Sequence, residues 1–194
     1  MQPSPKPSVW ERRAWAASFA GLSPPGEAEE WSEEAYLLPL GLGGRDIKVR
    51  GDALEMKDLL LERPDMQLWR PAARLPFPVP SASLERELIV RLALGQPLGR
   101  QRYTAEELLG ELLGPRHNVA VVTLRKRRRL FESAGCRAEV AEVEVGGRRT
   151  LTACAEHEDP DRLRQAAAEL GLDRHPNLDY PTALARLVVP RRAA

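Results

Sequence analysis

Two lysines and an arginine are spaced so that they share one face of a short hairpin. Residues 46–57 read as two strands around a tight Gly-Asp turn. Because side chains alternate along a strand, Lys48 and Arg50 share a face of the first strand, and Glu55 and Lys57 share a face of the second. The chain has only four lysines among its 29 basic residues, and two of them lie here. Such a cationic face can neutralise the oxygens of a phosphate or another anion.

A second strand candidate, at residues 123–129, repeats this arrangement with Lys126 and Arg128 on one face. The strand candidates that follow it carry carboxylates, among them Glu142 and Glu156. If the charged faces form the wet side of an antiparallel sheet, opposite charges pair there in solvent. If a barrel turns them inward, the basic groups would bind a phosphate chain and the carboxylates a divalent metal, Mg or Mn.

Strand and helix signals in the rest of the chain predict an α+β fold. Residues 9–19 fit either a strand or a helix, and residues 22–33 form a loop. Further strands are expected at 35–40, 45–61, 119–132, 138–145 and 148–156, of which the last three form an antiparallel meander. Helices are expected at 84–94 after a Ser83 cap, from the capping box at Thr104 to Gly114-Pro115, at 160–170 after Asp159, and at 181–189 after Asp179.

Five prolines fall between residues 64 and 80. Proline cannot donate a backbone hydrogen bond, so this span is predicted to be neither a regular helix nor a central strand. We expect an extended connector, with Trp69 and Phe77 packed on the body of the protein.

Composition indicates one globular domain over residues 9–190, preceded by a flexible tail over residues 1–8. A net charge of +1 in 194 residues argues against a protein that coats a polyanion. Cys136 and Cys154 are expected to be free thiols, since no secretory segment precedes them and the chain reads as cytoplasmic. No apolar run is long enough to span a membrane.

The order of these elements resembles the CYTH, or triphosphate tunnel metalloenzyme, superfamily. The resemblance covers roughly residues 9–189 and is carried by Lys48-Val-Arg50, the 54–57 strand, Lys126-Arg-Arg128 and an acidic strand at 155–160 that leads into a helix. It implies a closed antiparallel β-barrel, or tunnel, with peripheral helices and a metal-dependent triphosphatase activity. By position it implies phosphate-binding roles for Lys48, Arg50, Lys57, Lys126 and Arg128, and metal-binding roles for Glu11, Glu142 and Glu156.

The sequence departs from the family pattern at three interior positions. The family's first strand has the pattern E-x-E-x-K, whereas here Glu11 is followed by Arg13 and Trp15. On the late acidic strand Cys154 stands where the family has the first of two acids, so that only Glu156 remains. Losing two carboxylates weakens a two-metal site, which affects catalysis more than phosphate binding.

Three functions follow from these observations. The first is binding of a triphosphate-containing ligand, such as inorganic triphosphate, polyphosphate or a nucleotide, with hydrolysis by a divalent metal if the site is active. The second is a non-catalytic sensor or adaptor that binds the phosphate ligand alone. The third, which the sequence favours least, is an RNA-binding module that uses the basic stretch 125–129 on the outside of the fold.

Overall fold

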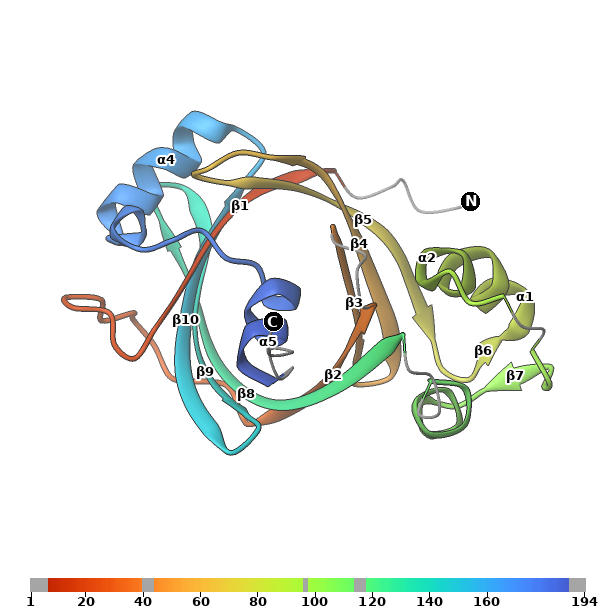
Figure 1. Cartoon of the computed structure of the whole chain (residues 1–194). Helices are drawn as coiled ribbons and strands as arrows, with labels where there is room; N and C mark the ends of the chain where they lie inside the picture. Colours follow the sequence, from red (N-terminus) through yellow and green to blue (C-terminus); the bar gives the residue numbers. More distant parts are fainter. Residues whose placement is uncertain (1–6, 40–43, 96–97, 114–117, 189–194) are drawn as a thin grey trace, which may run out of the picture.

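In a computed structural model of the chain, eight strands form a closed antiparallel barrel (Figure 1). The structure describes residues 7–39, 44–95, 98–113 and 118–188. The barrel strands follow one another in the order β1 (Val9–Ala16), β10 (Arg148–His157), β9 (Cys136–Val145), β8 (Val119–Ser133), β2 (Ser32–Pro39), β3 (Arg45–Arg50), β4 (Ala53–Glu62) and β5 (Gln67–Pro76). A closed barrel with helices outside is the fold class that the CYTH resemblance implied, and the structure confirms it.

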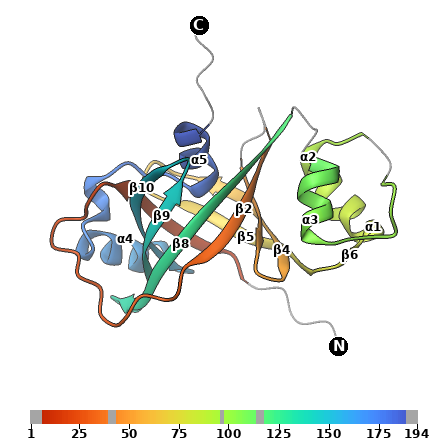
Figure 2. The same ribbon diagram turned by 90° about the horizontal axis from the view of Figure 1, so that it is seen from below.

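Three groups of helices surround or enter this barrel (Figures 1 and 2). The first follows the short strand β6 (Val79–Pro80) and consists of α1 (Ser81–Leu84), η1 (Glu85–Ile89), α2 (Val90–Leu92), and, after β7 (Arg102–Tyr103), α3 (Ala105–Glu107) and η2 (Leu108–Leu113). The second is α4 (Pro160–Glu169) with the short turn η3 (Leu172–Arg174), and the third is α5 (Tyr180–Val188). No helix among the described residues is both long and apolar enough to cross a membrane.

Apolar residues on the outer face of the barrel explain where the first two groups pack. Ile47, Leu54 and Met56 point outward from the cationic hairpin and are buried under the helices between residues 81 and 113. On the far side, Ala153 and Ala155 of β10 are buried under α4. Both faces of these strands are therefore covered: their outward residues pack against the helices, and their inward residues line the barrel interior.

Helix α5 covers one end of the barrel, as Figure 1 shows when the barrel is viewed along its axis. Its Tyr180 and Leu184 are buried against inward residues of β2, β8 and β9, among them Tyr36 and Val143. The side chain of Asp179 accepts a hydrogen bond from the backbone N–H of Thr182 at 2.7 Å, which confirms the predicted cap. This end of the barrel is consequently apolar and filled.

Most predicted elements are present, and two predictions need correction. The proline-rich span is not a connector, since β5 is a full barrel strand. The strand tolerates Pro71 for two reasons. The pairing with β4 is irregular at this point, because the register shifts between Met56 and Lys57. In addition, β1 pairs only with residues 67–69 of β5, so the backbone N–H that proline lacks is not needed on that side. The helix expected from residue 84 begins at Ser81 after a Pro80 cap, so Ser83 lies inside it.

Among the other predicted elements, two had alternatives or caps that the structure decides, and others lie partly outside the described residues. Residues 9–19, for which two forms were open, contribute strand β1. The capping box at Thr104 is present, with reciprocal hydrogen bonds to Glu107. The predicted helix stop at residues 114–115 and most of the tail at 1–8 lie outside the described residues.

Candidate functional site

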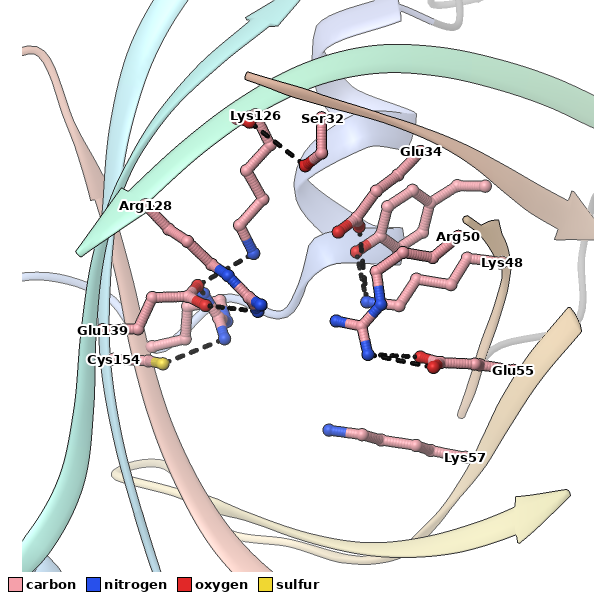
Figure 3. A network of polar contacts seen from close by, with 12 residues as sticks. Ser32, Glu34, Lys48, Arg50, Glu55, Lys57, Lys126, Arg128, Glu139 and Cys154 are labelled. Carbon is pink, nitrogen blue, oxygen red and sulfur yellow. Dashed lines mark hydrogen bonds and ion pairs between the residues drawn. The ribbon is translucent and has the colours of Figure 1, made fainter. Parts of the chain in front are cut away.

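The barrel interior changes from apolar to charged along its axis. Beyond the end filled by α5, inward side chains of opposite charge come from seven strands. Figure 3 shows those of β2, β3, β4, β8 and β9 pointing toward the centre. A first group is almost wholly buried, and comprises Glu11, Arg13, Glu34, Lys48, Lys126 and Glu139. A second group is partly exposed, and comprises Arg50, Glu55, Lys57, Arg128 and Glu156. The two groups have different partners and different access to solvent.

Arg13 lies at the centre of the buried group. Its Nε donates to Glu11 at 2.8 Å, and its Nη1 donates to Glu139 at 3.4 Å and to Thr152 at 3.3 Å. Its Nη2 donates to the sulfur of Cys154 at 3.0 Å. One guanidinium thus joins β1, β9 and β10 across the interior, with 6% of its side chain exposed.

Glu139 receives several cations at once. Lys126 Nζ lies 2.9 Å from one of its oxygens and Arg128 Nη1 lies 3.7 Å from the other. Burial alone would raise the pKa of Glu139, but Lys126 and Arg13 outweigh it and hold that pKa well below its usual range. Glu139 is therefore a carboxylate at neutral pH.

On the opposite wall, Lys48 and Arg50 of β3 have separate carboxylate partners. Lys48 Nζ lies 3.4 Å from Glu34 and donates to Tyr36 Oη at 3.1 Å. Arg50 pairs with Glu55 at 2.9 Å, with 36% of its side chain exposed. Lys48 is a buried structural cation, whereas a ligand can reach Arg50.

A pair of carboxylates faces Lys57. Glu11 and Glu156 are direct partners across β1 and β10, and Lys57 Nζ lies 3.9 Å from each. Burial opposes ionisation of Glu11, yet Arg13 and Lys57 lower its pKa to about 2. Burial and the neighbouring Glu11 raise the pKa of Glu156. The pair thus divides into a firmly ionised carboxylate and one that is protonated more readily.

The structure brings together seven of the eight residues that the sequence singled out. Those that face the interior are Lys48, Arg50, Lys57, Lys126, Arg128, Glu11 and Glu156. Glu142 lies instead on the outer face of β9, where Arg127 Nη2 donates to it at 2.6 Å. The acid of β9 that points inward is Glu139.

The position of Glu142 has a simple cause in the alternation of β9. Its outward residues Cys136 and Val140 pack at the α4 side of the barrel wall, while its inward residue Val143 packs against α5. Both faces of the strand are therefore partly apolar, and hydrophobic alternation did not show which face is inside. Glu34 and Arg13 were likewise not identified as site residues. The alternation of side chains on β1 and β2 could have found them, because it places both on the inward face of their strands.

The interior carboxylates do not fit a two-metal site as they stand. Among the described residues, no group of three or more His, Cys, Asp or Glu side chains is arranged to hold a metal ion. Arg13 contacts both Glu11 and Glu139, and Lys57 lies 3.9 Å from an oxygen of Glu11 and from one of Glu156. Protein cations thus lie beside the carboxylates that Mg or Mn would require, and the residues present do not fit such a metal.

These pairs make stability dependent on pH. Glu11, Glu34 and Glu139 have lowered pKa values in the fold, so the stability they contribute is present above the ordinary carboxyl pKa and is lost as pH falls below it. Glu156, whose pKa is raised, acts in the opposite direction. We expect the free energy of urea unfolding to fall between pH 5 and pH 3, with Glu139 alone contributing about 2 kcal/mol.

The matched variants are Glu139→Gln and, as a control, Glu158→Gln at an exposed position. Glu139→Gln should be less stable at pH 6 but should lose less stability on acidification, whereas Glu158→Gln should follow the parent protein. If the free energy of unfolding changed equally with pH in all three proteins, Glu139 would not be an ion-paired carboxylate with a lowered pKa.

Comparisons with known proteins give structural neighbours only. No protein-family model matches the sequence, and no curated protein sequence matches it. A candidate adenylate cyclase from Bacillus halodurans is similar over 82% of this chain and 83% of its own, with 11% identity and a TM-score of 0.46. HpAC1 from Hippeastrum, a candidate adenylyl cyclase described as having a dominant triphosphatase activity, is similar over 84% of this chain and 88% of its own, with 10% identity and a TM-score of 0.40. Both of these likenesses extend over more than four fifths of this chain.

Proposed function

We propose that the open end of the barrel binds a triphosphate-bearing ligand, such as inorganic triphosphate, polyphosphate or a nucleotide, and does so without a metal. The observation that supports this is the convergence of three accessible cations from different strands. Arg50, Lys57 and Arg128 come from β3, β4 and β8, and 36%, 32% and 24% of their side chains are exposed. Cations that surround one space from several walls suit an extended anion with charge on every phosphate.

Two of these cations have partners with which a ligand can compete. Lys57 has only distant partners, since it is 3.9 Å from both of its carboxylates, longer than a hydrogen bond. Arg128 Nε, in contrast, donates at 2.5 Å to Glu29, whose side chain is exposed on the loop before β2. A phosphate chain can replace these contacts while the buried pairs behind them remain intact.

Binding without hydrolysis is the activity that the interior supports best. A guanidinium contacts both Glu11 and Glu139, and a lysine lies 3.9 Å from both Glu11 and Glu156. These cations stabilise phosphate charge but supply no activated water. We therefore infer a phosphate-ligand sensor or adaptor, and take metal-dependent triphosphatase activity as the alternative that the experiment must separate.

The test is titration calorimetry with inorganic triphosphate in EDTA. We expect saturable binding, weakened at least about tenfold by Arg128→Met, a loss of about 1.4 kcal/mol or more. Arg127→Met is the matched control, because it removes the same charge from the adjacent residue of β8 on the outer face. It should bind triphosphate like the parent protein.

Three results would overturn the proposal. Absence of saturable binding would remove the phosphate ligand. Phosphate release from triphosphate or ATP that needs Mg or Mn and is lost in Glu156→Ala would make the protein an enzyme. If single-stranded RNA competed with triphosphate, and if its binding depended on Arg127 rather than on Arg128, the binding site would lie on the outside of the barrel.

A further inference from the structure

A cavity of about 420 Å³ lies outside the barrel wall, away from the charged interior. It is bounded by the turn between β4 and β5, by α4, and by the segment from η3 to Asn177. Apolar side chains form much of its lining, namely Pro64, Met66, Leu163, Ala167, Ala168 and Pro176. This volume is within the range of cavities that bind small organic molecules.

Arg12 lines this cavity and has an unmet hydrogen-bonding requirement. It lies between Glu11 and Arg13 on β1 but points outward, and only 5% of it is exposed. Its Nη2 donates to the backbone carbonyls of Leu172, at 2.7 Å, and of His175. Its Nη1 is buried and has no acceptor among the described residues.

An unpaired guanidinium nitrogen in this position is costly. Leaving a buried donor without an acceptor is destabilising, and more so when the group is charged. Burial lowers the pKa of Arg12, and the nearby Asp65 and Asp173 offset this only in part. A carboxylate bound in the cavity would stabilise Arg12 through its opposite charge, and it would accept a hydrogen bond from Nη1 once the guanidinium turned toward the cavity.

Two acidic residues of the lining, Asp65 and Asp173, indicate which charge a ligand would carry besides its carboxylate. Asp65 is already paired with Arg164 at 2.9 Å. Asp173 is exposed and makes no ion pair within the part of the chain that the structure describes. A purely anionic ligand would be repelled by Asp173, whereas a ligand that also carries an ammonium group would pair with it.

We propose that this cavity binds a small zwitterion with an apolar side chain, of the size and charge of a free α-amino acid. Its carboxylate lies on Arg12, its ammonium group on Asp173, and its side chain against Met66 and Leu163. The site is separate from the phosphate site proposed above, since Arg12 and the phosphate-facing residues lie on opposite faces of the barrel wall. Occupancy would also fix the segment 172–177, whose carbonyls Arg12 holds.

Calorimetry and thermal denaturation with L-leucine, L-methionine and L-phenylalanine test the proposal. We expect at least one to bind with a Kd below about 1 mM. The corresponding methyl ester, which lacks the carboxylate, and the des-amino acid, which lacks the ammonium group, should each bind at least about tenfold more weakly. Asp173→Asn should weaken the amino acid but not the des-amino acid.

Two further variants keep the test independent of Arg12, whose loss could unfold the 172–177 segment. Ala168→Phe adds a large side chain to the cavity lining at an exposed position of α4 and should abolish binding. Gln165→Phe places the same side chain at an exposed position of α4 outside the lining, and should bind normally. Triphosphate binding should be unchanged in both variants.

Failure of all three amino acids to bind saturably would overturn the inference. So would binding that survives Ala168→Phe, or binding that is as tight for the methyl ester as for the free acid. None of these results would bear on triphosphate binding, which is measured separately.

Discussion

Replacing Arg13 with methionine is expected to lower the free energy of unfolding by about 3–5 kcal/mol. The variant would leave Glu11 and Glu139 in the barrel, with only 8% and 10% of their side chains exposed, and would remove the cation that contacts both. For a chain of this length the melting temperature should fall by about 10 °C. Urea unfolding and thermal denaturation at pH 7 measure the loss.

A double-mutant cycle separates charge pairing from packing. Glu11→Gln in the Arg13→Met background should restore part of the stability, because without Arg13 only Lys57, 3.9 Å away, offsets the buried charge of Glu11. A coupling of at least about 1 kcal/mol is expected, and strictly additive losses would contradict the pairing. EDTA should leave the melting temperature of the parent protein unchanged, since the cation at this position is part of the chain.

Local signals were sufficient for most of the fold. The turn at Gly51 and the alternation after it placed Lys48, Arg50 and Lys57 on one face, and the structure confirms that these three side chains share the interior (Figure 3). The cap at Asp159 begins α4 as expected, where its carboxylate accepts from the N–H of Asp161. Such features depend on neighbouring residues, so they can be identified without knowing the tertiary structure.

What the sequence could not supply depends on closure of the barrel. Proline excludes a central strand only if both edges are paired, and β5 is paired on both edges only over residues 67–69. The inward face of β9 is apolar near Val143 only because α5 enters that end, so Glu139 could not be separated from Glu142 by pattern alone. In both cases the role of a strand depends on a segment that is distant in the sequence: β1 for β5, and α5 for β9.

The departures at Arg13, Trp15 and Cys154 meet in one place, although the sequence showed them only as separate substitutions. Arg13 donates to Cys154 and lies 4.6 Å from the centre of the Tyr180 ring. Trp15 packs edge-on against the same ring at 4.8 Å, and its Nε1 donates to the carbonyl of Leu178. These three residues therefore form one cluster, which packs against the start of α5 through Tyr180 and Leu178.

Tyr180 anchors α5 to the barrel. We expect Tyr180→Ala to lower the free energy of unfolding by about 3–5 kcal/mol. Its ring is 4% exposed and stacks on Tyr36 at 5.3 Å between centroids. Lys126 lies 4.9 Å from the same ring, close enough for a cation–π contact. Truncation would leave a cavity between the helix and the barrel wall, and denaturant unfolding would report the loss.

The two stacked tyrosines provide a control for this prediction. Tyr180 Oη is buried without a hydrogen-bond partner among the described residues, so Tyr180→Phe should be neutral or stabilising by up to about 1 kcal/mol. Tyr36 Oη accepts from Lys48, so Tyr36→Phe should cost about 1–3 kcal/mol by leaving that ammonium group with one partner fewer. Equal losses in the two phenylalanine variants would show that Tyr180 Oη has a partner after all, and that the hydroxyl, as well as the ring, holds α5 in the barrel.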